Sequence, residues 1–204
     1  MVGDIDSQKR ALRTQLRSRR DAMTAQDREQ STVGLTEQLQ RLVAETGARS
    51  LSCFLSTPNE PNVRPFVNWA EANGIRVLFP ITRPDGLLDW TVGEDELEVA
   101  GLFGMPEPSG QLLGPIAVND VDLMLIPAAA VDVTGMRLGW GRGYYDKTIG
   151  SMEAAPPVYA VIFDHELLDA LPYDARDQPV SGAVTPERTV TFPPPPHTKP
   201  VKVR

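Results

Sequence analysis

The feature that most constrains the fold is a series of short apolar runs, each five to seven residues long and bounded by Gly, Pro, Asp or Ser. They cover residues 50–56 (SLSCFLS), 75–80 (IRVLFP), 123–127 (LMLIP) and 158–163 (VYAVIF). Such runs are typical of strands that are covered on both faces. Between the first two lies a helix-length stretch, residues 63–73, with Phe66, Val67 and Ala70 at helical spacing. This order predicts right-handed crossovers and a mostly parallel sheet in an α/β fold.

Two helices are predicted before the first strand. Residues 6–23 form the first, and in it Lys9 and Arg13 lie four positions apart on one face. Thr24, followed by Asp27, resembles a capping box that starts the second helix. The apolar face of that helix is made by Leu35, Leu39, Leu42 and Val43, and Gly47 is a typical stop.

The rest of the chain gives weaker patterns. We expect a hairpin and irregular loops over residues 84–120, a helix over 144–151, a short helix over 164–171 and an edge strand over 183–190. The tail, residues 193–204, is rich in proline and is expected to be disordered. Residues 1–192 are therefore predicted to form a single domain.

Charge and cysteine content limit the class of protein. The 204 residues carry a net charge of −7, which argues against a nucleic-acid binder. Residues 1–28 nevertheless hold seven Lys or Arg against four acids, a balance that suggests a small anionic ligand. The single cysteine, Cys53, excludes a disulfide framework and a multi-cysteine zinc site. With no apolar leader or membrane-length run, we expect a soluble, cytoplasmic protein that binds no membrane. We also expect it to be a monomer.

The most informative segment is Gly135 to Asp146, which follows one predicted strand and precedes a predicted helix. Its alternate glycines, Gly139, Gly141 and Gly143, let the backbone approach a ligand closely and turn its N–H groups inward. Arg137 and Arg142 add cations, so the segment suggests a phosphate site, with Asp146 available to an accompanying Mg²⁺. Neither common nucleotide fingerprint is present, and the glycines alone are equally compatible with a tight strand-to-helix turn.

Two further features have functional and structural interpretations. Lys9 and Arg13 either clamp an oligophosphate or belong to a solvated basic face, and an isolated helix favours the second. Glu60 directly follows a predicted strand and either accepts N–H donors of a heterocycle or acts as a helix N-terminal acid. A Ser-His-Asp triad would require His165, but the chain has no nucleophile-elbow motif.

Together these segments resemble the 5-formyltetrahydrofolate cyclo-ligase family, also called 5,10-methenyltetrahydrofolate synthetase. The similarity extends from Lys9 to Val190. Its motifs occur in family order at residues 9–13 (KRALR), 55–60 (LSTPNE), 77–80 (VLFP), 104–108 (GMPEP), 137–146 (RLGWGRGYYD) and 184–187 (VTPE). The arginine- and glycine-containing motif is the most specific of them.

The resemblance implies a fold and a reaction. The fold would be the Rossmann-like α/β sandwich shared with ribose-5-phosphate isomerase and CoA-transferase relatives. The reaction would be the ATP-dependent conversion of 5-formyltetrahydrofolate to 5,10-methenyltetrahydrofolate, ADP and phosphate. The folate substrate would be one with or without a polyglutamate tail. ATP would phosphorylate the formyl oxygen, which makes it a good leaving group when N10 closes the ring. Aligning the reactants and neutralising charge would be the protein's task.

The resemblance also implies roles for residues. The catalytic residues would be Lys9, Arg137 and Tyr144. ATP would be bound by Lys9, Arg10, Arg13, Arg137, Leu138, Gly139, Trp140, Gly141, Arg142, Gly143, Tyr144 and Tyr145. The folate would be bound by Arg13, Leu55, Glu60, Trp140, Gly141, Arg142, Gly143 and Tyr144, and Mg²⁺ by Asp146 and Asp177.

The chain departs from the family pattern near Asp177, where Arg176 and Ser181 replace the His and Asp of several relatives. Two other functions are compatible with some of the same sequence features. A folate or nucleotide sensor would bind without turnover, and a sugar-phosphate isomerase of similar architecture would need no ATP.

Overall fold

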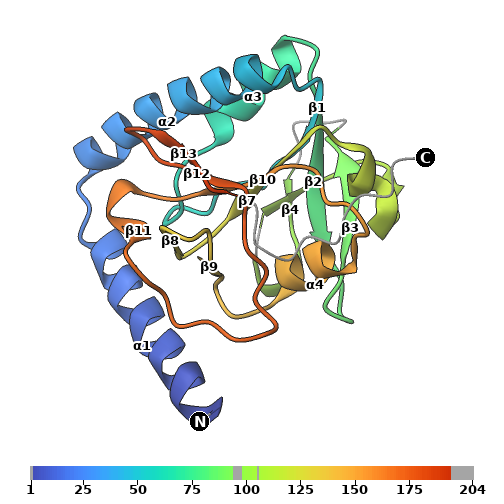
Figure 1. Cartoon of the computed structure of the whole chain (residues 1–204). Coiled ribbons are helices and arrows are strands. Elements are labelled where there is room, and N and C mark those ends of the chain that lie inside the picture. Colours follow the sequence, from blue (N-terminus) through green and yellow to red (C-terminus); the bar gives the residue numbers. More distant parts are fainter. Residues whose placement is uncertain (1, 94–97, 105, 194–204) are drawn as a thin grey trace.

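The central sheet has the mostly parallel arrangement that the apolar runs predict. The computed structural model describes residues 2–93, 98–104 and 106–193, and in this part eight strands form a sheet in the order β13-β12-β10-β7-β1-β2-β3-β6 (Figure 1). Its centre contains β1 (Ser50–Ser52), β2 (Arg76–Thr82), β7 (Leu123–Pro127) and β10 (Val158–Val161). These strands are parallel to their neighbours in this group, and β12 (Gly182–Val184) is parallel to β10. The α/β prediction is confirmed.

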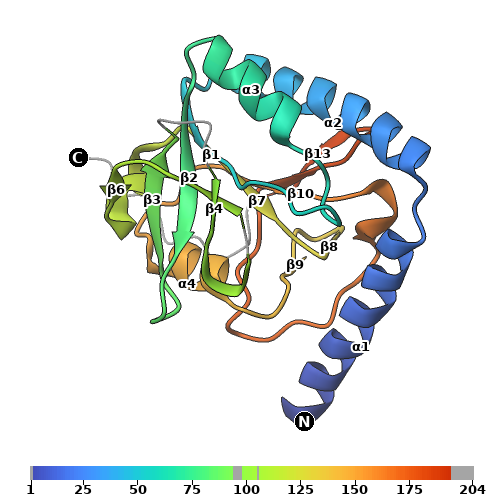
Figure 2. The same ribbon diagram turned by 180° about the vertical axis from the view of Figure 1, so that it is seen from behind.

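Helices cover both faces of the sheet because its central strands are apolar on both. In β7, Leu123 and Leu125 belong to the core under α2 (Ala25–Thr46) and α3 (Arg64–Ala72). The intervening Met124 and Ile126 face the other core, which includes α4 (Tyr144–Ser151). Figure 2 shows α2 and α3 on one side of the sheet and α4 on the other. As predicted, the capping box of Thr24 with Asp27 starts α2, and Gly47, in the left-handed conformation, caps its end.

The first helix, α1 (Val2–Asp21), packs beside the main sheet against a small second sheet. That sheet has the order β11-β8-β9, with β8 (Ala130–Asp132), β9 (Arg137–Leu138) and β11 (Leu167–Leu168). Leu16 of α1 is buried against Leu138 in a third apolar cluster. This packing brings the basic face of α1 to the segment that follows β9.

The short helix predicted over residues 164–171 is wrong. A single 3₁₀ turn, η3 (Asp164–Glu166), leads directly into β11. The carboxylate of Glu166 turns back to accept the N–H of Phe163 at 2.9 Å, and Leu167 and Leu168 pair with β8. Tertiary pairing with β8 therefore replaces the local helical pattern.

The edge strand predicted over residues 183–190 is wrong in its extent, because two strands occupy this region. The strand β12 turns back at Thr185–Arg188 into β13 (Thr189–Thr191), which pairs with it antiparallel. Pro186 has no N–H to donate to a ladder, and the N–H of Thr185 bonds to the carbonyl of Arg188 at 2.9 Å. A tight hairpin results.

The region 84–120 contains the expected hairpin and several short elements. The strand β3 (Leu88–Val92) pairs antiparallel with β2 and with β6 (Leu112–Leu113), while β4 (Glu98–Ala100) pairs with β5 (Pro106–Pro108). The described residues of this region also include two 3₁₀ turns, η1 (Leu102–Gly104) and η2 (Pro115–Asp120). Residues 194–204 lie outside the described residues, so the domain boundary at 192 and the disordered tail stay predictions.

Candidate active site

The glycine-containing segment and the basic face of α1 meet at the carboxyl ends of the parallel strands. The guanidinium Nε of Arg13 donates to the carbonyl oxygen of Gly139 at 2.7 Å. Gly141 and Gly143 have φ of 100° and 71°, values that favour glycine, and Gly143 directly precedes α4. A Cβ on Gly141 would meet the Arg13 guanidinium at 3.6 Å. Helix and loop are thus close-packed, which excludes the interpretation of an isolated solvated face for Arg13.

Lys9 is buried one turn earlier on α1, with 5% of its surface exposed. Its ammonium donates to Asp174 Oδ2 at 2.7 Å and to Asp177 Oδ2 at 2.5 Å. Burial lowers the pKa of Lys9, but the hydrogen bonds and charges of the two carboxylates outweigh this effect and raise it above its ordinary value. Lys9 therefore carries a fixed positive charge. Asp177, predicted as a metal ligand, is its partner.

Arg137 and Asp146 form the second ion pair of the site. Arg137 is 3% exposed, and its Nη2 donates to Asp146 Oδ1 at 2.6 Å. The same carboxylate oxygen accepts the backbone N–H of Gln178 at 3.2 Å. Asp146 thereby ties the start of α4 to β9 and to the segment that carries Asp177.

An inner cavity of about 120 Å³ lies beside this ion pair. Most of the predicted site residues line it: Leu55, Glu60, Arg137, Gly139, Trp140, Arg142, Gly143, Tyr144, Tyr145 and Asp146. They come from the loop after β1 and from the segment between β9 and α4. Such a position, beyond the carboxyl ends of strands in an open α/β sheet, is the usual place for a ligand.

Two buried donors on the wall of the inner cavity lack partners. In the described part of the chain, Arg137 Nε and Trp140 Nε1 have no hydrogen-bond acceptor. Buried donors are rarely left unsatisfied, and both side chains belong to residues that line the inner cavity. Burial also raises the pKa of Tyr145, which keeps its phenol protonated at neutral pH.

Some predicted residues lie outside the lining of the inner cavity. They are Lys9, Arg10, Arg13, Leu138, Gly141 and Asp177. The Leu138 side chain is buried in the cluster with Leu16, away from the inner cavity. Arg10 is exposed on α1, one residue beyond the buried Lys9.

Several residues of the inner cavity were missed by the sequence analysis, above all Thr82 and Glu107. Thr82 ends β2, and Glu107 belongs to β5. A signal for Glu107 existed in the family motif at residues 104–108, which by itself suggests only a turn. Apolar walls are supplied by Phe54, Pro80, Leu88, Pro106 and Pro127.

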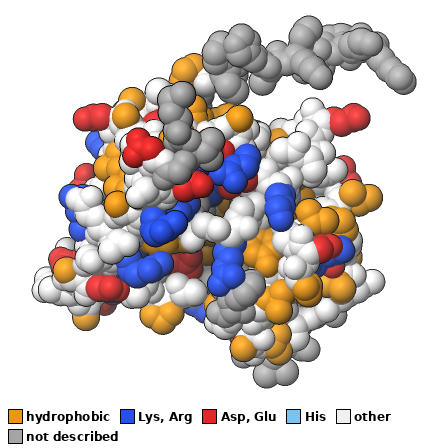
Figure 3. Space-filling view, turned by 90° about the horizontal axis from the view of Figure 1, so that it is seen from below, with side chains coloured by type: hydrophobic (Ala, Val, Ile, Leu, Met, Phe, Trp, Pro, Cys, Tyr) orange, Lys and Arg blue, Asp and Glu red, His pale blue; other side chains and the backbone are white. Residues whose placement is uncertain are grey.

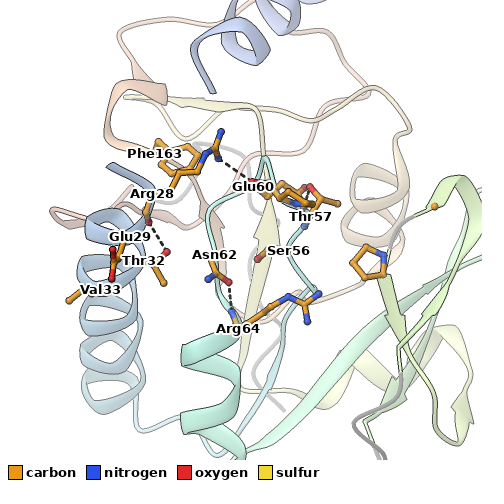
Figure 4. A pocket seen from close by; sticks show the side chains of 13 residues that line it. Arg28, Glu29, Thr32, Val33, Ser56, Thr57, Glu60, Asn62, Arg64 and Phe163 are labelled. Carbon is orange, nitrogen blue, oxygen red and sulfur yellow. Dashed lines mark hydrogen bonds between the residues drawn. The ribbon is translucent and has the colours of Figure 1, made fainter. Parts of the chain in front are cut away.

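An outer groove of about 740 Å³ adjoins the inner cavity, since Thr57, Glu60 and Pro106 line both. Figure 4 shows Arg28 and Phe163 on one side of this groove and Arg64 on another. The guanidinium of Arg28 donates to the neutral carbonyl oxygens of Pro58, at 3.1 Å, and Arg20. Arg64 forms an ion pair with Glu98. Seen from below, Lys and Arg side chains gather around a hollow in the surface (Figure 3).

The predicted Mg²⁺ ligands do not form a metal cage. Among the described residues, no group of three or more His, Cys, Asp or Glu side chains is placed to hold a metal ion. Asp146 and Asp177 each bind a cationic side chain instead. A Mg²⁺ carried by nucleotide phosphates commonly needs only one or two carboxylates, and Asp146 on the cavity wall fits that requirement.

Comparison with known proteins gives one family. The model of the 5-formyltetrahydrofolate cyclo-ligase family matches residues 5–186. The 5-formyltetrahydrofolate cyclo-ligase of Mycolicibacterium smegmatis is 32% identical over 187 residues, covering 89% of this chain and 95% of that protein. The enzyme of the same name from Escherichia coli K12 is 26% identical over 179 residues, with coverage of 85% and 97%.

Solved structures agree on the fold. The 5,10-methenyltetrahydrofolate synthetases of Aquifex aeolicus and Mycoplasma pneumoniae superimpose with TM-scores of 0.76 and 0.71, each at 22% identity. They cover 95% and 88% of this chain, and 97% and 99% of their own chains. The α/β sandwich expected from the resemblance is confirmed. The described helices include none that is both long and apolar enough to cross a bilayer. The family match and the 32% identity to the M. smegmatis enzyme show that this chain belongs to the 5-formyltetrahydrofolate cyclo-ligase family.

Proposed function

We propose that this chain catalyses the ATP-dependent conversion of 5-formyltetrahydrofolate to 5,10-methenyltetrahydrofolate, with release of ADP and phosphate, at the inner cavity. The observation that carries the proposal is the contact of Arg13 with Gly139, which joins a basic helix face to a glycine-containing loop beside Glu60. Phosphate-binding groups and a carboxylate suited to a heterocycle thus line one place. The reaction needs both.

The chemistry assigned to the protein is alignment and charge neutralisation. The γ-phosphate of ATP is transferred to the formyl oxygen, N10 then bonds to the formyl carbon and loses its proton, and the phosphate leaves with that oxygen. Arg137 Nε and Trp140 Nε1, the unpartnered donors, are suited to the oxygens that gain negative charge during transfer. Preorganised donors of this kind lower the barrier without covalent participation.

The cations proposed to bind the phosphates of ATP are already paired with carboxylates, and the phosphates would replace those carboxylates as partners. Lys9 is bound by Asp174 and Asp177, and Arg137 by Asp146, so each of these cations is held in position before ATP arrives. Arg13, Arg10 and the amides from Leu138 to Tyr145 complete the proposed nucleotide site. We assign Mg²⁺, bound with ATP, to Asp146 with Asp177 as a further ligand; the ion would neutralise phosphate charge.

The reaction itself is tested by mixing the protein with 5-formyltetrahydrofolate and MgATP. We expect the near-ultraviolet absorbance of the methenyl product to develop only when ATP is present. Binding of either ligand without product would indicate a sensor, and turnover of a sugar phosphate without ATP would indicate an isomerase. No product under conditions where a known cyclo-ligase works would contradict the proposal.

Glu60 is proposed to accept hydrogen bonds from the pterin ring. Its Oε2 is fixed by the N–H and the hydroxyl of Thr57, both at 2.9 Å, which leaves Oε1 for a ligand in the inner cavity. We expect Glu60→Gln to raise the KM for folate about tenfold or more, because an amide donor replaces an acceptor, and to leave the KM for ATP within about twofold. Steady-state kinetics measure both. Glu37→Gln, which changes an exposed carboxylate outside both the outer groove and the inner cavity, is the control. Equal rises in both KM values would reject the pterin contact.

The outer groove is proposed to bind the glutamate tail of the folate. An inner cavity of about 120 Å³ is smaller than the roughly 300–1,000 Å³ of sites that enclose a small ligand, so a folate must extend beyond it. The adjoining groove supplies Arg28, whose hydrogen-bond acceptors are neutral carbonyls and leave its charge available to a carboxylate. This arrangement supports a substrate that carries a polyglutamate tail.

Replacing Arg28 tests the tail site. We expect Arg28→Gln to raise the KM for the triglutamate form about three- to tenfold, because one partly exposed charge contact is lost, and to affect the monoglutamate less. The comparison is made at low salt, where screening is weak. Arg41→Gln, on the exposed part of the same helix, serves as the control. A variant that treats both substrates as the wild type does would refute the tail site.

We further propose that the protein is a monomer that works in the cytoplasm. Burial raises the pKa of Cys53 to about 12, which keeps this thiol protonated and unreactive. A chain whose single cysteine is buried needs no oxidising compartment. Light scattering at working concentration checks the monomer directly.

A further inference from the structure

Glu107 is a buried carboxylate to which the proposed function assigns no role. It lies on β5, it is 6% exposed, and it lines the inner cavity. Among the residues that the structure describes, its hydrogen-bond donors belong to Thr82 alone, and it has no Lys or Arg partner. An ionised carboxylate that is buried without a cation destabilises a fold unless donors satisfy it.

Hydrogen bonds fix one oxygen of Glu107, whereas the other oxygen has no hydrogen bond among the described residues. Oε1 accepts the backbone N–H of Thr82 at 2.8 Å and its hydroxyl at 2.6 Å. Any side chain at Gly101 would overlap the carboxylate, so the backbone of the preceding turn is shaped to admit it. Oε2 accepts no hydrogen bond from a described residue.

The same arrangement occurs at Glu60, in the loop between β1 and α3. There Thr57 donates its N–H and its hydroxyl to one carboxylate oxygen, and both residues line the inner cavity. Two glutamates with one threonine-bound oxygen each therefore border one small cavity. This repetition favours a shared purpose over a structural accident at either position.

We propose that Glu107 is a second substrate-binding residue, whose Oε2 accepts a hydrogen bond from an N–H group of the reduced pteridine that Glu60 does not bind. This inference rests on the proposed function. The pteridine of 5-formyltetrahydrofolate bears N–H donors on both of its rings, so two acceptors orient it better than one. Orientation matters because the formyl oxygen must be aligned with the transferred phosphate. Thr82 acts as a positioning residue for Glu107.

The test compares equilibrium binding of two ligands to the full chain by calorimetry. In Glu107→Gln the amide oxygen replaces Oε1 toward Thr82, so the NH₂ group faces the pteridine donor. We expect the Kd for 5-formyltetrahydrofolate to rise about tenfold to hundredfold and the Kd for ATP to stay within about twofold. Thr82→Val should produce a smaller rise in the folate Kd, and Thr82→Ser, which keeps the hydroxyl, should restore it.

Glu71→Gln is the control, because Glu71 is an exposed carboxylate of α3 that lies outside both the inner cavity and the outer groove. Its folate Kd should equal that of the wild type. An unchanged folate Kd in Glu107→Gln, or equal rises for folate and ATP, would overturn the assignment. Failure of the wild-type protein to bind either ligand would instead reject the proposed function, so the two failures are distinguishable.

Discussion

Replacement of Arg137 by methionine should lower kcat/KM at least about a hundredfold. The variant removes a buried cation from the wall of the inner cavity, together with Nε, a donor that has no acceptor in the described part of the chain. Removing one preorganised donor that stabilises transition-state charge typically reduces the rate by roughly 10² to 10³, or about 2.7–4 kcal/mol. Arg137 also holds Asp146 at 2.6 Å, so this carboxylate loses its partner as well.

Arg137→Lys distinguishes charge from geometry. A lysine keeps the positive charge but cannot present two parallel N–H groups, so we expect it to recover less than about a tenth of the wild-type kcat/KM. Single-turnover measurements at saturating ATP would place the loss in the chemical step. A methionine variant within about tenfold of wild type, with an unchanged free energy of unfolding, would show that Arg137 is structural.

The second large effect concerns stability, through the ion pair of Arg20 and Glu166. Arg20 is 1% exposed, and its Nε and Nη2 donate to the two carboxylate oxygens of the fully buried Glu166 at 2.6 Å and 2.8 Å. Its guanidinium also lies 4.7 Å from the ring centre of Trp140 and 5.3 Å from that of Phe163. The Arg20 side chain of α1 therefore contacts Trp140, which lines the inner cavity, and Phe163, which lines the outer groove.

Glu166→Leu should reduce the free energy of unfolding by about 3–5 kcal/mol, because it leaves the Arg20 charge buried without a counter-charge. The double variant Arg20→Met with Glu166→Leu should be more stable than Glu166→Leu alone, since no uncompensated charge remains. Urea denaturation measures both. Arg41→Met, which removes an exposed pair with Glu37 at 4.0 Å, should change stability by less than about 1 kcal/mol. A Glu166→Leu variant as stable as the wild type would refute this account.

The elements that were predicted correctly are those whose sequence pattern depends on residues close together along the chain. The apolar run at β7 matches its strand from Leu123 to Pro127, and α2 begins after the Thr24 box and ends at Gly47. The error at residues 164–171 occurs where a distant partner decides the outcome, whereas the error at 183–190 comes from a tight hairpin turn at Thr185–Arg188. Leu167 and Leu168 pair with β8, which lies more than thirty residues away along the chain.

The candidate site shows the same division. Spacing on a helix placed Lys9 and Arg13 on one face, and the family motif indicated the segment from Arg137 to Asp146. Neither reveals that Asp174 and Asp177 bind Lys9, or that Glu107 reaches the cavity of Glu60.

The sequence by itself determined the kinds of elements and their approximate limits, and it predicted which residues would bind phosphate and pterin. The tertiary structure alone decided which charges are paired and which donors and carboxylates face a common cavity. The physical reason is that helix and strand preferences arise from interactions among residues a few positions apart. The partner of a buried charge such as Lys9, 165 residues away at Asp174, depends on strand order and packing.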